Sequence, residues 1–226
     1  MLSGGGNLSV ISTRDLSSLP DIDALRRLMQ SLAMLDAILS REWQYRYFSF
    51  NRHWSSGEQM GSMRNGQGNH YFALFNVAGC WLKGFDHEAP MSPFASNPPK
   101  SVAGVFDGVP AEFQACLTEP AFVIDETTFC IWRRYDDGVW RRGPVSFAAG
   151  EDDPDGSAGL LQYLDGRPQT YREWATEYYE REIPFGAVQS IYAHDPLDQR
   201  MVSELNPEVS LSELSDDVEE IGYLQR

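Results

Sequence analysis

The stretch HYFALFNVAGCWLKGF, residues 70 to 85, decides the fold class of this chain. Two apolar, aromatic-rich runs flank a short turn at NVAG, and each run has the length of a strand. A Gly-rich turn, GQGN, separates the first run from SMRN, residues 62 to 65. These segments therefore predict an antiparallel meander of three or four strands.

Upstream of the meander, the spacing of the apolar residues changes from the pattern of a helix to that of a strand. WQYRYFSF, residues 43 to 50, alternates and is aromatic, which predicts a strand followed by a polar loop over 51 to 59. Residues 21 to 40 repeat apolar side chains every three or four positions, which predicts an amphipathic helix. Residues 1 to 19 contain a glycine run and are expected to form a disordered tail.

Downstream, strand signals give way to helix signals. Residues 109 to 117 predict a short helix, and 128 to 134 with 139 to 143 predict a hairpin about Asp-Asp-Gly. Helices are then expected at 158 to 164, 170 to 182, 196 to 204 and 211 to 222. Strands followed by helices indicate an α+β fold. We expect one domain: an α+β core over 20 to 145, with a helical acidic region, 146 to 226, packed on it.

The charge is distributed unevenly. The net charge is −15, but residues 1 to 144 carry 15 acids and 13 bases, whereas residues 145 to 226 carry 18 acids and 5 bases. A balance of −13 in the last 82 residues repels nucleic-acid phosphate and anionic membranes, and attracts basic partners. We therefore expect a basic protein partner, and neither nucleic acid nor a membrane; the sequence leaves the oligomeric state open.

Other composition signals limit the possible functions. The three cysteines lie far apart in apolar contexts, and no secretion signal or membrane-length apolar run is present, which favours a cytoplasmic protein with reduced thiols. The chain has no phosphate-binding loop, no nucleophile elbow and no pair of closely spaced cysteines. We therefore expect no cofactor and no metal site.

The first candidate site follows the last meander strand. In GCWLKGFDHEAP, residues 79 to 90, a predicted strand ends at Asp86, His87 and Glu88. A carboxylate could orient His87 as a general base, but neighbours on an extended chain point to opposite sides, so the partner would have to come from another loop. We favour the alternative, in which His87 is hydrogen-bonded at a loop start and Asp86 caps the turn.

The second candidate is the arginine hairpin, WRRYDDGVWRRG, residues 132 to 143. A two-residue turn would set Arg134 opposite Arg141 and Arg133 opposite Arg142, and a three-residue turn would set Arg134 opposite Trp140. Arginines placed this closely need a counter-charge. It could be a bound anion or Asp136; we favour acids from the C-terminal helices over a ligand.

The third candidate is an acidic surface on the C-terminal helices. Its residues are Glu173, Glu177, Glu180, Asp216, Asp217 and Glu220. The last three lie in the second half of the expected helix 211 to 222, where the helix dipole disfavours negative charge. The surface could be a solvated face that keeps the protein soluble, or a docking surface for a basic partner.

The sequence resembles a family of bacterial proteins without an assigned activity. The resemblance lies in WSSGEQMGSMRNGQGNHYFALFNVAGCWLKGFDHEAPMSP and in the later EPAF and TFCIWRR. The resemblance implies a bacterial cytoplasmic protein. Immunity proteins that neutralise bacterial toxins share the small acidic α+β character, although no motif of theirs matches. The leading hypothesis is a non-enzymatic, immunity-like interaction protein; the alternative is a small-molecule enzyme or ligand binder, with His87 as general base and the arginine hairpin as anion clamp.

Overall fold

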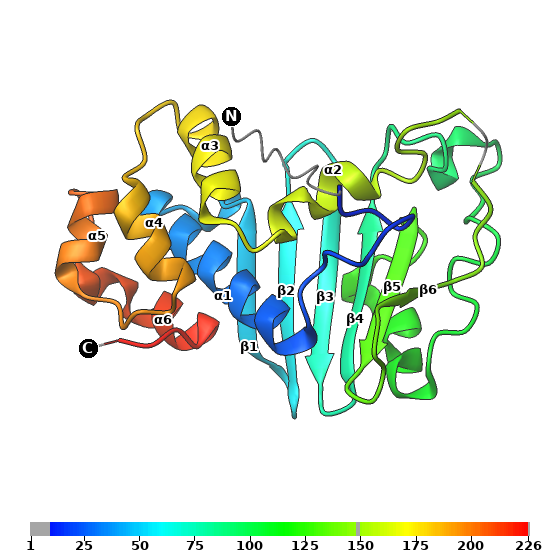
Figure 1. Ribbon diagram of the computed structural model, residues 1–226, viewed down its shortest axis with the longest axis horizontal. Helices are drawn as coiled ribbons and strands as arrows, with labels where there is room; N and C mark the ends of the chain where they lie inside the picture. The colour runs from blue at the N-terminus through cyan, green and yellow to red at the C-terminus, as the bar shows by residue number, and fades with distance from the viewer. Residues whose placement is uncertain (1–9, 148–149, 226) are drawn as a thin grey trace, which may run out of the picture.

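A single antiparallel sheet forms the centre of the protein (Figure 1). The computed structural model describes residues 10 to 147 and 150 to 225. Six strands pair in chain order: β1 (Phe48–Ser55), β2 (Glu58–Arg64), β3 (His70–Asn76), β4 (Gly79–Phe85), β5 (Phe129–Arg134) and β6 (Arg141–Arg142). With a helix before the sheet and helices after it, the predicted α+β class is confirmed.

Helices precede and follow the sheet. The α-helices are α1 (Ile22–Leu39), α2 (Ser157–Leu161), α3 (Pro168–Tyr178), α4 (Phe185–Tyr192), α5 (Gln199–Leu205) and α6 (Ser215–Ile221). The 3-10 turns are η1 (Trp43–Tyr45), η2 (Pro93–Ala95), η3 (Ala111–Thr118), η4 (Pro120–Phe122), η5 (Gln162–Leu164) and η6 (Leu211–Leu214). In Figure 1, α3 to α6 (yellow to red) gather beside α1 at the β1 end of the sheet. The sequence missed α4, which is short and contains a glycine.

The meander is longer than its sequence signal. The predicted loop over 51 to 59 is wrong: β1 runs to Ser55, which pairs with Glu58 across a two-residue turn. Gly57 occupies that turn at φ 76°, a conformation that glycine adopts without steric cost. The predicted strand over 43 to 50 is also partly wrong, because η1 takes its first residues and β1 begins only at Phe48.

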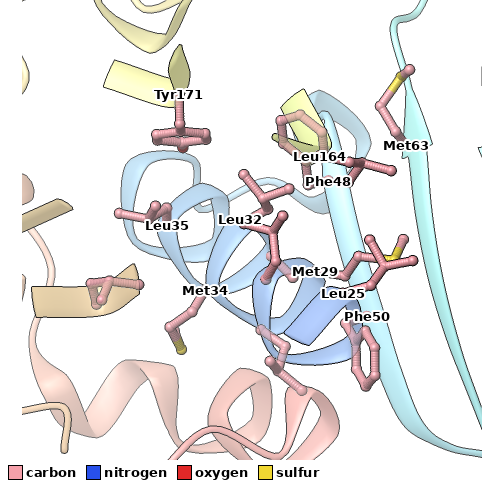
Figure 2. Close-up of a cluster of buried hydrophobic side chains, with 14 of the residues drawn as sticks. Leu25, Met29, Leu32, Met34, Leu35, Phe48, Phe50, Met63, Leu164 and Tyr171 are labelled. Atoms are coloured by element: carbon pink, nitrogen blue, oxygen red, sulfur yellow. The ribbon is translucent and has the colours of Figure 1, made fainter. Parts of the chain in front are cut away.

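One face of the sheet packs against α1. Asp21 caps this helix by accepting a hydrogen bond from the backbone N–H of Ala24 at 2.9 Å. Leu25, Leu32 and Leu35 are fully buried. Figure 2 shows Leu25 and Leu32 on the side of α1 toward Phe48 and Phe50 of β1, and Leu35 on the side toward Tyr171. The same apolar cluster continues through α2 to α6, so the acidic C-terminal region and the sheet share one core.

The opposite face of the sheet carries a second apolar cluster. Trp81 and Trp132 lie there under the segment that contains η3 and η4, which contributes Phe113 and Phe122. Alternate side chains of each strand reach the two faces, so one apolar cluster lies on each side of the sheet. The predicted helix over 109 to 117 is observed as the 3-10 helix η3.

The chain before α1 packs on the rest of the protein. Ile11 and Leu19 belong to the main core, and the Thr13 hydroxyl bonds the buried carboxylate of Asp155. Residues 10 to 19 therefore correct the expectation of a tail over 1 to 19; residues 1 to 9 lie outside the described part. Across the described ranges, 10 to 147 and 150 to 225, no helix has both the length and the apolar character that crossing a membrane needs.

Candidate functional site

His87 lies on the loop after β4 and forms a local polar contact. Its Nδ1 lies 2.6 Å from the side-chain oxygen of Asn69, which also accepts a hydrogen bond from the His87 backbone N–H at 3.0 Å. The side chain of Asp86 accepts a hydrogen bond from the backbone N–H of Glu88 at 3.0 Å, which closes a turn. This geometry matches the favoured interpretation of a loop-start histidine with a capping aspartate.

The surroundings of His87 offer little for catalysis. Its Nε2 lies 3.9 Å from a carboxylate oxygen of Glu88, whose side chain is 83% exposed. Five surface hollows of the described chain have linings that do not include Asp86, His87 or Glu88. Over residues 10 to 147 and 150 to 225, no group of three or more histidine, cysteine or acidic side chains is arranged to hold a metal ion.

The turn of the arginine hairpin supplies acidic partners for two of its four arginines, Arg134 and Arg141. Trp132 pairs with Arg141 and Ile131 pairs with Arg142, so neither predicted register is observed, and the connection between the strands is longer than three residues. The buried carboxylate of Asp137 lies between two arginines: Arg134 Nε is 3.4 Å from one oxygen and Arg141 Nε is 3.2 Å from the other.

The other hairpin arginines also have local partners. Arg134 additionally pairs with Asp136 at 3.3 Å. Arg133 donates to the backbone carbonyl of Asp137, and Arg142 donates to the carbonyls of Gly143 and Val145. The expected compensation by acids of the C-terminal helices is therefore corrected, since the counter-charge comes from the hairpin's own turn.

The last helix differs from its expected form. Residues 211 to 214 form the 3-10 helix η6, whose Ser210–Glu213 capping box is present, and the α-helix begins only at Ser215. Asp216 and Asp217 consequently lie in the first turn of α6, where the helix dipole favours carboxylates. The argument that these acids oppose the dipole is wrong for both residues.

Several acids of this region pair with arginines that precede or belong to β1. Arg46 binds Asp217 through both terminal nitrogens, and its side chain is only 9% exposed. Arg41 pairs with Glu213, and Arg52 lies 2.7 Å from Glu219. Asp217 is thus satisfied within the protein, which removes it from the set of free acids.

The remaining predicted acids are unpaired. Glu173, Glu177, Glu180, Asp216 and Glu220 are exposed, and among the described residues none has an arginine, lysine or histidine nitrogen within 4 Å. Glu173 accepts a hydrogen bond from Gln169 at 2.7 Å. Five of the six predicted partner-binding residues therefore retain uncompensated charge on α3 and α6.

Sequence reasoning missed an exposed aromatic turn between these two helices. We define the aromatic turn as Trp43, Tyr45 and Tyr178, which are 58%, 59% and 43% exposed. The Tyr178 hydroxyl of α3 donates to the backbone carbonyl of Tyr45 at 3.3 Å, which joins η1 to the end of α3. The alternating pattern of residues 43 to 50 concealed this turn, because exposed aromatics and strand aromatics look alike in sequence.

A buried lysine was missed as well. Lys83 is fully buried, and its ammonium contacts three acceptors: His70 Nε2 at 2.9 Å, the Val123 carbonyl at 3.2 Å and the Glu126 carbonyl. Burial lowers the pKa of Lys83 to about 7. Burial, with the Lys83 charge as a second cause, lowers the pKa of His70 to about 3, so this imidazole is neutral and accepts the hydrogen bond.

A buried carboxylate lies where α1 meets β1. Asp36 accepts hydrogen bonds from the backbone N–H groups of Tyr47 and Phe48 at 2.7 and 2.8 Å, and from the Tyr171 hydroxyl at 2.7 Å. Burial raises its pKa to about 6, although these hydrogen bonds act in the opposite direction. Because Asp36 is enclosed, its role is to join α1, β1 and α3.

The chain matches no family model, no curated protein and no solved structure. The functional argument therefore depends on the geometry of the chain alone.

Proposed function

We propose that this protein is a non-enzymatic interaction protein whose acidic C-terminal surface binds a basic protein partner, as bacterial immunity proteins do, in the cytoplasm. The observation that carries the proposal is the absence of internal counter-charge, among the described residues, at Glu173, Glu177, Glu180, Asp216 and Glu220. Asp217 differs from these five acids, because it is paired with Arg46.

Uncompensated charge of one sign favours association with the opposite sign. Such charges steer encounter and raise the association rate, and the effect decreases as salt screens it. The net charge of −15 adds a long-range field of the same sign. The alternative, an enzyme or ligand binder, has less support because His87 bonds an asparagine and the hairpin arginines are already occupied.

The test reverses three unpaired acids. The variant Glu177→Lys/Glu180→Lys/Glu220→Lys should lose the basic proteins that the wild type captures from a lysate of its source cells at low salt. The control Asp107→Lys/Glu112→Lys/Asp125→Lys changes the net charge equally, at exposed positions outside the C-terminal helices. If both variants capture the same proteins as the wild type, the acidic surface does not bind a basic partner.

A further inference from the structure

The side chains of Trp43 and Tyr45 in the aromatic turn are more than half exposed. All residues from Arg41 to Tyr45 are exposed, and η1 contributes no buried residue to the protein. Trp43 is the one exposed side chain among the six tryptophans, all of which lie in the described part. Large aromatic side chains that gain nothing from burial in the free protein are characteristic of the centre of a binding surface.

The aromatic turn is held in place from below. The Tyr178 ring stacks on Trp174 at a centroid distance of 5.0 Å, and it lies 5.6 Å from the ring of Tyr47. Its hydroxyl bonds the Tyr45 carbonyl. The Tyr178 ring and the backbone of Tyr45 are therefore held in place, which reduces the entropy lost on binding.

Unpaired acids lie near two members of the aromatic turn. Glu177 precedes Tyr178 at the end of α3, and Glu180 follows Tyr178 by two residues. Trp43 and Glu220 line one surface hollow together with Asp217. We call Glu177, Glu180 and Glu220 the acidic rim of the aromatic turn.

The nearby cations offset this rim in part, because Arg64 and Arg181 have no carboxylate oxygen within 4 Å among the described residues. Arg41 and Arg46 are neutralised by Glu213 and Asp217. Arg64 lies over the Trp43 ring, with its guanidinium carbon 5.6 Å from the centroid, and Trp43 nevertheless remains more than half exposed. This internal contact illustrates that a guanidinium fits against Trp43.

We infer that the aromatic turn is the centre of the partner surface and that it receives arginine side chains, which stack on Trp43 and Tyr45 while Glu177, Glu180 and Glu220 pair with their charge. The inference depends on the proposed binding of a basic partner and specifies its chemistry. Arginine is favoured over lysine because its planar guanidinium is weakly hydrated and stacks on aromatic faces.

The test compares deca-arginine with deca-lysine as probes, at low salt, using full-length protein. We expect the wild type to bind deca-arginine more tightly and to shield Trp43 from acrylamide quenching. The variant Trp43→Ser/Tyr45→Ser should lose about five- to thirty-fold in affinity for deca-arginine, as expected for two exposed cation–π contacts, and less than about two-fold for deca-lysine. Phe94→Ser is the control, since Phe94 is 54% exposed on η2.

The outcomes separate the two proposals. Failure of both peptides to bind the wild type would overturn the acidic binding surface and this inference with it. Equal binding of the two peptides, or an unchanged affinity for deca-arginine in the double variant, would overturn only the aromatic turn as its centre. A loss of the same size in Phe94→Ser would likewise count against it.

Discussion

Replacing the buried Lys83 by methionine should change how the stability of the protein depends on pH. Burial lowers the pKa of Lys83 to about 7 from an ordinary 10.5, whereas the unfolded chain keeps the ordinary value. Between these two values unfolding takes up a proton, so a rise in pH stabilises the folded state. Methionine has a similar length and carries no proton, so it removes the titration while filling most of the same space.

The magnitude follows from the two pKa values. Integrating the proton uptake from pH 7 to pH 8.5 gives about 1.5 kcal/mol of added stability for the wild type relative to Lys83→Met. Other groups titrate in or near this range. The three buried cysteines ionise in the unfolded chain, but they contribute equally to both proteins and cancel in the difference.

The assay is urea denaturation of both proteins at several pH values between 7 and 8.5, with Lys100→Met as a matched control. Lys100 is the other lysine of the chain and is exposed, so its replacement should leave the pH dependence unchanged. A constant stability difference between wild type and Lys83→Met would refute the reasoning. It would mean that His70 and the carbonyls of Val123 and Glu126 hold the ammonium strongly enough to offset its burial.

Three further perturbations test the core. The folded pKa of Asp36 is raised to about 6, so the folded protein keeps a proton that the unfolded chain releases. Urea denaturation should therefore show the free energy of unfolding of the wild type falling by about 3 kcal/mol relative to Asp36→Asn between pH 3.5 and 7, and parallel curves of stability against pH would contradict this. Gly84→Ala should lower the free energy of unfolding by about 1–3 kcal/mol, because the new Cβ would lie 2.2 Å from the Phe129 ring. Gly186→Ala has open space in α4 and should be neutral or stabilising by up to about 1 kcal/mol, so equal midpoints of thermal unfolding for the two variants would contradict this prediction. The three thiols are buried with raised pKa values, so a thiol reagent should modify them only after unfolding, and rapid labelling of the native protein would show otherwise.

Local pattern was sufficient for the fold class and for most elements. The two runs within residues 70 to 85 form β3 and β4 because apolar side chains on both faces of a strand need cover on both sides. The apolar spacing of residues 21 to 40 forms α1 because every third or fourth side chain shares one face. Ser210 and Glu213 satisfy the start of η6 through contacts three residues apart.

Pairing of charges was decided only by the tertiary structure. Asp217 has its counter-charge at Arg46, which is 171 residues distant in sequence, and nothing in either local segment indicates the match. In the sequence, Lys83 has the pattern of an ordinary polar residue near the end of a strand. In the structure, the segment that contains Val123 and Glu126 covers β4, and the Lys83 ammonium is buried against the carbonyls of these two residues. Counting charges in the sequence therefore overestimated the number of unpaired acids on the last helix.

The sequence by itself determined α1, the strands β3 and β4, the order of a helix, then the sheet, then further helices, and the concentration of negative charge in the last 82 residues, because these depend on neighbours along the chain. The tertiary structure decided which acids stay unpaired, where η1 exposes Trp43 and Tyr45, and that Asp137 pairs with both Arg134 and Arg141. Each of these depends on which segments come within a few ångströms of each other, and the spacing of residues in the sequence does not encode that distance.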